Sequence, residues 1–352
     1  MNPPAPSPSP RSSPFSRPRR ATCRALLTTL ALGLGLSASE AALAEPAQGA
    51  AQARSGSASS QTEESLAVRG VYVQQFTVED EPKLHELIDK AKAAGMNTFV
   101  VDLWRRSPQY AKAVETIRNA GLHYVPRITL FPDGARPGQI DDRELLEKRW
   151  RFVDYALKLG ATDIQLDYIR FSSRNAPSPE NASKVLAVIK FFQQRIRERG
   201  ARLQIDVFGE VSYAPSIRIG QDMRLFAPEL DAVCPMLYPS HFEPYKETAL
   251  VPYETVHGAL VALERQTKNH AIPVYPFIES FNYRHRMTDA ERAVYFEAQL
   301  EAVLNSSAQG FYVWSVGNYY DIPFAVLERR ARARGEQAPI AGMPSSAAPI
   351  PP

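Results

Sequence analysis

A strand pattern and a helix pattern alternate eight times between Arg69 and Ala333, and no other feature of the sequence limits the fold so strongly. The strand segments are short apolar runs, and the helix segments carry apolar residues at three- and four-residue spacing. The expected strands are 71–76, 97–104, 123–131, 163–171, 202–208, 230–237, 272–278 and 310–316. The expected helices are 83–94, 110–120, 143–159, 182–199, 221–227, 252–267, 289–304 and 322–332.

Eight such units predict an α/β fold, a (β/α)8 TIM barrel, formed by a single domain over residues 69–333. Continuous apolar strands that alternate with helices indicate a parallel sheet covered on its outer face. The length of about 265 residues is close to the roughly 250 of a typical barrel. The alternative is an open doubly wound sheet, which usually has a glycine-rich phosphate turn after its first strand. Residues 76–80 contain no glycine, so the barrel is the better prediction.

The two ends of the chain differ in composition from this core. Residues 1–44 have a basic start, an apolar stretch at 25–38 and small residues before Glu45, which is the layout of a secretory signal peptide. The alternative is a membrane anchor, but the apolar stretch is shorter than the about 20 residues that a spanning helix needs. Residues 45–68 are expected to form a flexible linker, and residues 334–352 a disordered tail rich in Pro and Ala.

Removal of the predicted leader changes both the net charge and the cysteine content of the protein. Residues 1–44 hold five Arg and one Glu, so the net charge of +3 for the whole chain becomes −1 for the remainder. No basic patch is left to indicate a nucleic-acid partner. Cys23 lies in the predicted leader, so Cys234 has no partner for an intramolecular disulfide after export. Cys234 could be a nucleophile, but a buried, unreactive thiol is the commoner role in such an apolar run.

Three aspartates occur inside otherwise apolar strands. Asp102, Asp167 and Asp206 belong to the second, fourth and fifth expected strands, and Arg127 belongs to the third. A TIM barrel places its chemistry at the C-terminal ends of its strands, and an unpaired charge in an apolar strand is costly. We therefore expect these four side chains to converge on one cavity. Asp167 and Asp206, with Glu210 just past the fifth strand, are the catalytic candidates.

The same rule selects the candidate substrate-binding residues. Polar and charged side chains hydrogen-bond sugar hydroxyls, and aromatic rings supply flat apolar surfaces for sugar rings. The candidates are Asp102, Trp104, Arg127, Gln165, Tyr168, Arg170, Met236, Tyr238, His241, Glu279, Trp314 and Asn318.

Each candidate also has a purely structural interpretation. Asp167 could pair with Arg127 or Arg170 in a salt bridge that stabilises the barrel, and Asp206 could do the same. The remaining polar candidates could be solvated loop residues, and the aromatic ones could be lids over the core.

Other enzyme classes have little support in the sequence motifs. The chain has six His and no His-Glu-x-x-His pair for a metal site. It has no Gly-x-Ser-x-Gly elbow of a serine esterase and no glycine-rich phosphate loop. We therefore expect no metal site and no organic cofactor.

Five segments carry a further signal. They are residues 163–171 (Asp-Ile-Gln-Leu-Asp-Tyr-Ile-Arg-Phe), 206–209 (Asp-Val-Phe-Gly), 219–222 (Ile-Gly-Gln-Asp), 234–241 (Cys-Pro-Met-Leu-Tyr-Pro-Ser-His) and 314–319. Taken in this order they resemble a bacterial family of proposed glycoside hydrolases, known mainly as a domain of unknown function, over nearly the whole folded part. The resemblance implies a barrel distantly similar to the α-amylase-like hydrolases. It implies Asp167 as the nucleophile and Asp206 or Glu210 as the acid.

These observations predict a glycoside hydrolase that acts on a polysaccharide in the periplasm or after secretion. Two carboxylates would flank the scissile bond, one as acid and one as nucleophile or base, and burial would raise the pKa of the acid. The expected partner is a polysaccharide or oligosaccharide, with no nucleic acid and no stable membrane anchor. The alternatives are a carbohydrate-binding barrel without catalysis and a metal-dependent polysaccharide deacetylase.

The exported protein should begin near Glu45, because signal peptidases cut after small residues such as those of the Ala42-Leu43-Ala44 sequence. N-terminal sequencing of the protein recovered from the periplasm or the medium checks this. Chains recovered there that still begin with Met1 would contradict it.

Overall fold

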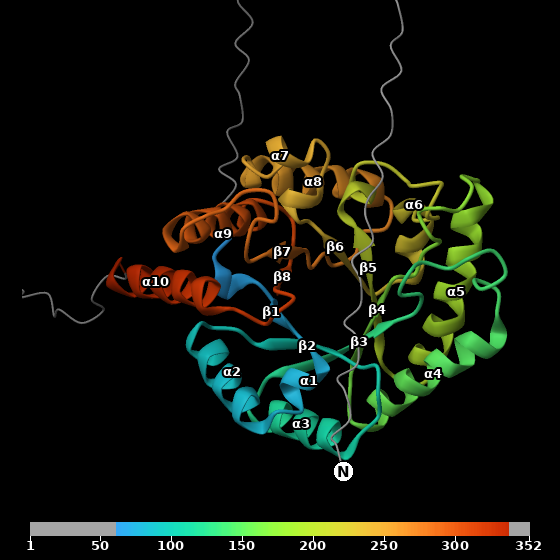
Figure 1. Cartoon of the computed structure of the whole chain (residues 1–352), viewed down its shortest axis with the longest axis horizontal. Helices are drawn as coiled ribbons and strands as arrows, with labels where there is room; N and C mark the ends of the chain where they lie inside the picture. The colour runs from blue at the N-terminus through green and yellow to red at the C-terminus, as the bar shows by residue number, and fades with distance from the viewer. Residues whose placement is uncertain (1–60, 338–352) are drawn as a thin grey trace, which may run out of the picture. The chain divides into compact units, whose positions relative to one another are not determined.

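Eight parallel strands close into a barrel in the computed structural model, which describes residues 61–337 (Figure 1). Each strand pairs with the next along the chain, and β8 pairs with β1 to close the ring. The predicted TIM barrel is confirmed. The strands are β1 (Val68–Val73), β2 (Thr98–Asp102), β3 (His123–Thr129), β4 (Asp163–Asp167), β5 (Arg202–Phe208), β6 (Ala232–Met236), β7 (Phe277–Glu279) and β8 (Gly310–Trp314).

Helices connect the strands and surround the barrel (Figure 1). The long helices are α2 (Glu81–Ala93), α3 (Pro108–Asn119), α4 (Arg143–Lys158), α5 (Glu180–Arg197), α8 (Pro252–Thr267), α9 (Asp289–Leu304) and α10 (Asp321–Gln337). The short ones are α1 (Gln75–Val78), α6 (Met223–Phe226), α7 (Tyr245–Thr248) and the 3-10 turns η1 (Glu63–Ser65), η2 (Gly209–Ser212), η3 (Ala227–Glu229) and η4 (Pro239–His241). Helices α2 and α5 are followed by Gly95 and Gly200, each with a positive φ, which ends a helix at little cost.

Side chains alternate along the strands between two cores. Phe99 and Ile164 belong to the larger core between the sheet and the helices. Val100, Cys234 and Tyr312 belong to a second core that fills the inside of the barrel. The alternation follows from the two-residue period of a strand, and the filled interior leaves the C-terminal rim as the place for chemistry.

Strands β4 and β7 differ most from the lengths that the apolar pattern predicted. Strand β4 ends at Asp167, because Tyr168 has a φ of 55° and leaves the extended conformation. Strand β7 covers three residues, with one separate bridge between Val233 and Val274. Pro273 and Pro276 lack the N–H groups that a regular ladder requires there.

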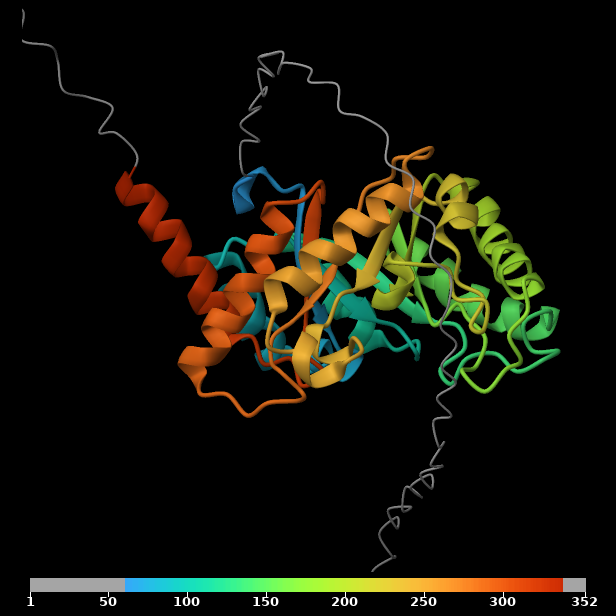
Figure 2. The same ribbon diagram turned by 90° about the horizontal axis from the view of Figure 1, so that it is seen from above.

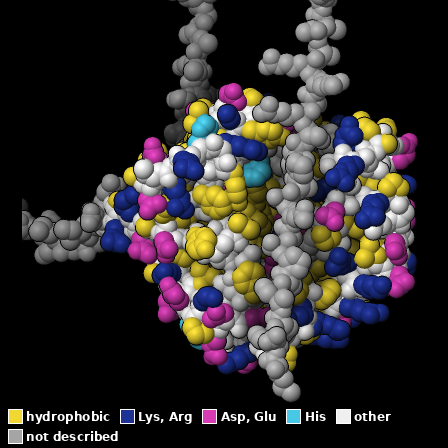
Figure 3. Space-filling model, in the orientation of Figure 1, with side chains coloured by type: hydrophobic (Ala, Val, Ile, Leu, Met, Phe, Trp, Pro, Cys, Tyr) yellow, Lys and Arg dark blue, Asp and Glu magenta, His cyan; other side chains and the backbone are white. Residues whose placement is uncertain are grey.

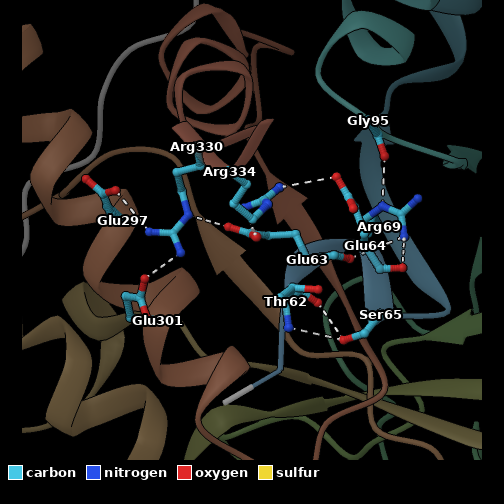
Figure 4. A network of polar contacts seen from close by, with 10 residues as sticks. All are labelled: Thr62, Glu63, Glu64, Ser65, Arg69, Gly95, Glu297, Glu301, Arg330 and Arg334. Carbon is cyan, nitrogen blue, oxygen red and sulfur yellow. Dashed lines mark hydrogen bonds and ion pairs between the residues drawn. The ribbon is translucent and has the colours of Figure 1, made fainter. Parts of the chain in front are cut away.

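Ion pairs join the first described residues to the last helix (Figure 4). Glu63 of η1 is buried and pairs with both Arg330 and Arg334 of α10. Arg330 also reaches Glu297 and Glu301 of α9 at 3.1 and 2.6 Å. Figure 2 shows α10 (red) on the same side of the barrel as the start of the described chain (blue), away from α4 and α5 (green). This network holds η1, which precedes β1, against helices α9 and α10.

The described part therefore reaches slightly beyond the expected limits of the folded domain, residues 69 and 333. The predicted leader, residues 1–44, and most of the predicted linker and tail lie outside the described residues. Within residues 61–337, no helix has both the length and the apolar character needed to cross a bilayer.

Gly70→Ala should destabilise the barrel by about 1–3 kcal/mol, the usual cost of overpacking a core. A Cβ atom at position 70 would lie 2.7 Å from Cδ1 of Tyr312, which is itself fully buried. The measurement is urea unfolding of wild type and variant. Gly335→Ala is the control, because a Cβ there meets nothing within 4 Å. A Gly70→Ala protein as stable as the control would contradict the prediction.

Candidate active site

Four charged side chains meet at the C-terminal ends of β2 to β5. The guanidinium group of Arg127 donates to Asp102 through Nη1, to Asp167 through Nη2, and to Asp206 through Nε at 3.3 Å. The side chains of Arg127, Asp167 and Asp206 are 8%, 1% and 2% exposed, while Asp102 is 19% exposed. The structure thus brings together the carboxylates that the sequence singled out, around one cation.

Three carboxyl groups around one guanidinium leave a surplus of negative charge. Burial, and next the charge of Asp167, raise the pKa of Asp206 well above its usual range, and Arg127 offsets this only in part. Burial opposes the charge of Arg127, but Asp167, Asp102 and Asp206 outweigh it and raise the pKa of the guanidinium. Oδ1 of Asp206 is buried without a hydrogen-bond partner among the described residues. Asp206 is therefore the member of the cluster best suited to hold a proton.

Aromatic rings form one wall of this charged cluster. The Tyr72 hydroxyl donates to Asp102, and its ring centroid lies 4.1 Å from that of Trp314. The guanidinium carbon of Arg127 lies 5.3 and 5.5 Å from the ring centroids of Tyr72 and Trp314. The Tyr238 ring follows, 6.1 Å from Trp314. These rings supply an apolar face beside the carboxylates.

Tyr72 was missed by the sequence analysis. The first strand was expected to continue to residue 76, so residues 74–76 were taken as its end. In the structure β1 stops at Val73. Strict two-residue alternation inside 71–76 would have found Tyr72 as an inward-facing residue.

Two non-glycine residues with positive φ border the site. Tyr168 has a φ of 55°, and its backbone N–H donates to Oδ1 of Asp167 at 2.5 Å. Asn318 has a φ of 57°; its Oδ1 accepts from the N–H of Gln74 and its Nδ2 donates to the carbonyl of Tyr72. Bulky residues in this region are strained, and such strain clusters at functional sites. Tyr168 orients Asp167, and Asn318 ties the loop after β8 to β1.

Glu279 is fully buried and supports the loop after β6. Its carboxylate accepts from the backbone N–H of Ser240 at 2.9 Å, from the Ser240 hydroxyl at 2.8 Å and from the Tyr295 hydroxyl at 2.5 Å. His241, half exposed, has its Nδ1 3.7 Å from the same carboxylate. Glu279 therefore positions the turn that carries Tyr238 and His241, and it is not on the cavity surface.

Gln165 lies one layer deeper in the barrel than Asp167. Its Nε2 atom contacts Oε1 of Gln204 at 3.2 Å and Sγ of Cys234 at 3.3 Å, and the side chain is fully buried. Gln165 therefore lies beneath the cluster of charged side chains. Burial also raises the pKa of the Cys234 thiol well above its usual range, as expected for an unreactive cysteine.

Arg170 is not a partner of Asp167. Its Nη1 donates to the carbonyl of Phe171 at 2.9 Å, and its guanidinium stacks over the rings of Tyr168 and Phe208, at 5.1 and 4.8 Å. Of the two salt bridges considered for Asp167, the one with Arg127 is present.

The remaining candidates stand around the rim. Trp104 is 54% exposed and carries the Arg105 guanidinium 5.1 Å above its ring. Glu210 is exposed in η2, just past β5. Met236 is half-buried at the end of β6, next to the inner core. Among residues 61–337, no three His, Cys, Asp or Glu side chains are grouped as metal ligands.

Comparison with known proteins places the chain among carbohydrate-active proteins. A sequence profile of the family described as "Putative glycosyl hydrolase domain" matches residues 142–320, just over half of the chain. This stretch contains Asp167, Asp206 and Glu279. A comparison with curated proteins gives no match.

Solved structures share the fold at low sequence identity. The C-terminal domain of a chitinase-like protein ("putative chitinase") from Desulfitobacterium hafniense has a TM-score of 0.55 and 13% identity, over 75% of this chain and 99% of that one. A GH5_18 variant from Streptomyces cattleya, in complex with Manb1-4GlcNAc, has a TM-score of 0.59 and 11% identity, over 78% and 82%. An endo-beta-1,4-mannanase from Thermotoga petrophila has a TM-score of 0.54 and 9% identity, over 79% of each chain.

Asp206→Asn should become more stable relative to wild type as the pH rises from about 4 toward 8. The folded-state pKa of Asp206 is raised above the unfolded value of about 3.9. Its proton therefore stabilises the wild type fully below that value, and the stabilisation is lost as the pH rises toward the folded-state pKa. Asparagine has no such proton to lose. Thermal unfolding of both proteins over this pH range measures the difference.

Asp163→Asn is the matched control for this measurement. Asp163 lies at the other end of β4, where burial raises its pKa but hydrogen bonds from His123 and Arg202, each 2.9 Å, outweigh burial and lower it. Its stabilisation is fully present above the unfolded pKa of about 3.9 and is lost only below it, so this variant should show no rise in relative stability between about pH 4 and pH 8. The same trend in both variants would contradict the assignment.

Proposed function

The chain belongs to this family of glycosyl hydrolases, and we propose that it cleaves the glycosidic bonds of a polysaccharide with Asp206 as acid and Asp167 as nucleophile or base. One observation carries the proposal. Two buried carboxyl groups on neighbouring strands contact the same guanidinium, and burial, with the charge of Asp167, raises the pKa of Asp206 well above its usual range. A protonated and an ionised carboxyl side by side are what glycosidic hydrolysis requires.

The reaction follows from these protonation states. Asp206 gives its proton to the oxygen of the leaving sugar, which takes the electron pair of the breaking C–O bond. Asp167 either attacks the anomeric carbon or removes a proton from the water that does so. In the first case a water molecule then attacks the anomeric carbon, breaks its bond to Asp167 and gives a proton to the ionised Asp206. In the second case Asp206 takes a proton from solvent and Asp167 releases its proton to solvent. Arg127 touches both carboxylates and keeps them in place.

The surrounding residues support this assignment of roles. The backbone N–H of Tyr168 donates to Oδ1 of Asp167, which fixes the direction of this carboxylate. Trp314 and Tyr238 offer ring surfaces for the sugar. Asp102, the most exposed carboxylate of the cluster, is suited to accept from sugar hydroxyls. Glu210 is the alternative acid, but it is exposed and belongs to the turn beyond the strand.

A carbohydrate-binding barrel without catalysis is the second candidate. The observation that favours it is the burial of Asp167 and Asp206, which are 1% and 2% exposed and held by Arg127. Such a cluster could stabilise the barrel while the rings around it bind sugar. The two candidates differ in turnover, which the first requires and the second excludes.

The place of action is also part of the proposal. The basic, apolar and small-residue segments of residues 1–44 support export, and a polysaccharide substrate outside the cytoplasm is consistent with it. The protein would then act in the periplasm or after secretion.

Asp167→Asn should reduce turnover by about a thousandfold or more, because the positive charge of the oxocarbenium-like transition state loses its nearby anion. The fold should survive. Arg127 keeps Asp102 and Asp206 as partners, and loss of the Asp167 charge makes ionisation of Asp206 easier. The large penalty of about 3–5 kcal/mol for an unpaired buried charge therefore does not apply. A reducing-end assay on a polysaccharide panel that includes mannan and chitin, with thermal unfolding alongside, measures both effects.

Asp163→Asn serves again as the control, because it removes a buried, ion-paired carboxylate from the same strand at the opposite end of the barrel. It should lose stability and keep its turnover per folded molecule. Wild-type turnover in Asp167→Asn would exclude Asp167 as the catalytic carboxylate. Sugar binding by a wild-type protein that turns over none of the panel would favour the binding barrel.

A further inference from the structure

A hollow on the barrel rim is lined by arginines and aromatic rings. It lies between the loop after β7 and the loop after β8 and has a volume of about 680 Å³. Arg284, Arg286 and Arg292 line it from one side, and Tyr283 and Tyr319 contribute rings that are 45% and 72% exposed. None of the described residues that line it is an aspartate or a glutamate. The proposed reaction uses none of these five side chains.

The arginines of the hollow carry positive charge that the described residues neutralise poorly. Arg284 and Arg286 form no ion pair with any carboxylate in residues 61–337. Arg292 lies 3.3 Å from Asp289, whose side chain is 86% exposed, and its own Nε is buried without a partner among the described residues. An exposed pair of this kind contributes little. Three guanidinium groups therefore face one weakly held carboxylate.

One of these arginines is held in a fixed orientation. Nε of Arg284 donates to the carbonyl of Ser240 at 2.7 Å, and its guanidinium carbon lies 4.4 Å from the ring centroid of Tyr245. These contacts occupy Nε and one face of the group. The terminal Nη atoms have no hydrogen-bond partner among the described residues, so they are free to bind a ligand. A fixed guanidinium loses less freedom on binding than a mobile one.

A series of aromatic contacts leads from the hollow to the active site. The ring of Tyr283 lies 5.0 Å from that of His241, which lies 5.6 Å from Tyr238, which lies 6.1 Å from Trp314. Figure 3 shows hydrophobic side chains (yellow) gathered over the middle of the barrel, near the places of β6, β7 and β8 in Figure 1, with His (cyan) and Lys or Arg (dark blue) beside them. A sugar chain bound at Trp314 can therefore extend over these rings toward the arginines.

We propose that this hollow binds negatively charged sugar residues, so that the polysaccharide is acidic and carries carboxylate or sulfate groups on its rings. The proposal rests on the proposed function and names the class of its substrate. Guanidinium groups bind carboxylate and sulfate oxygens through paired, charge-assisted hydrogen bonds. The rings of Tyr283 and Tyr319 provide surfaces for the sugar itself. Neutral sugars would leave Arg284 and Arg286 without a counter-charge.

The test is binding by calorimetry to Asp206→Asn protein expressed from the full-length sequence, so that no substrate is consumed. The probes are oligogalacturonate, a sulfated galactan oligosaccharide, and neutral mannan and chitin oligosaccharides of equal length. The charged probes should bind at least about tenfold more tightly than the neutral ones, and the preference should shrink as salt is added. Whichever charged probe binds identifies carboxylate or sulfate as the recognised group.

Arginine variants locate the binding site. In the same background, Arg286→Gln should weaken binding of the charged probe about tenfold, since one charge-assisted hydrogen bond is lost. Arg284→Gln should do so as well. Arg174→Gln, an exposed arginine after β4 that lines another hollow, is the control and should change nothing. Equal losses in all three variants would mean diffuse attraction and would overturn the proposed site.

Failure here is distinguishable from failure of the proposed function. If the neutral probes bind as tightly as the charged ones while wild type cleaves a neutral glycan, the acidic-substrate proposal is wrong and the hydrolase stands. If the charged probes bind through Arg284 and Arg286 but wild type cleaves none of them, the site stands and the hydrolase proposal fails.

Discussion

The buried guanidinium of Arg127 is the interaction on which the rest of the site depends. It joins the ends of four strands, since its three partners come from β2, β4 and β5 and it belongs to β3. Charged groups taken out of water are costly unless they are paired and hydrogen-bonded. Further hydrogen bonds around Arg127 meet this requirement: the Tyr72 hydroxyl donates to Asp102, and the backbone N–H of Tyr168 donates to Asp167. The cluster therefore fixes positions as well as charges.

The excess of carboxylates over cations gives this cluster its chemistry. One guanidinium cannot balance three ionised carboxylates in a buried place, so retention of a proton is favoured, and burial together with the charge of Asp167 favours it on Asp206. A cluster that served only to stabilise the fold would have a net charge closer to zero. A surplus carboxyl group in it would lower the stability without any compensating function. The same surplus becomes useful when a positively charged transition state forms beside it, because the remaining carboxylates then stabilise that charge. This is why we favour hydrolysis over binding alone.

Much of the fold was predictable from the sequence, and less of the site was. Alternating apolar strands and amphipathic helices leave few architectures, and the barrel rule then selects strand-end residues such as Asp167 and Asp206. The two-residue period of a strand, however, shows on which face of the sheet a side chain lies, and not how deep it lies in the barrel. Gln165 therefore was grouped with Asp167 although it lies a layer below, and Glu279 was grouped with surface residues although it is buried under a turn. The left-handed backbone at Tyr168 depends on tertiary contacts that no local pattern contains. Two of the rim arginines, Arg284 and Arg286, come from the loop after β7, which has no periodic pattern.

The acidic cluster and the cationic hollow also constrain each other. With one proton on Asp206, the cluster still carries negative charge in excess of Arg127, so an anionic sugar placed directly on it would be repelled. The same sugar is attracted by Arg284 and Arg286 on the rim. An acidic chain is thus accommodated most favourably when its charged ring sits in the hollow and the ring at the scissile bond carries no charge.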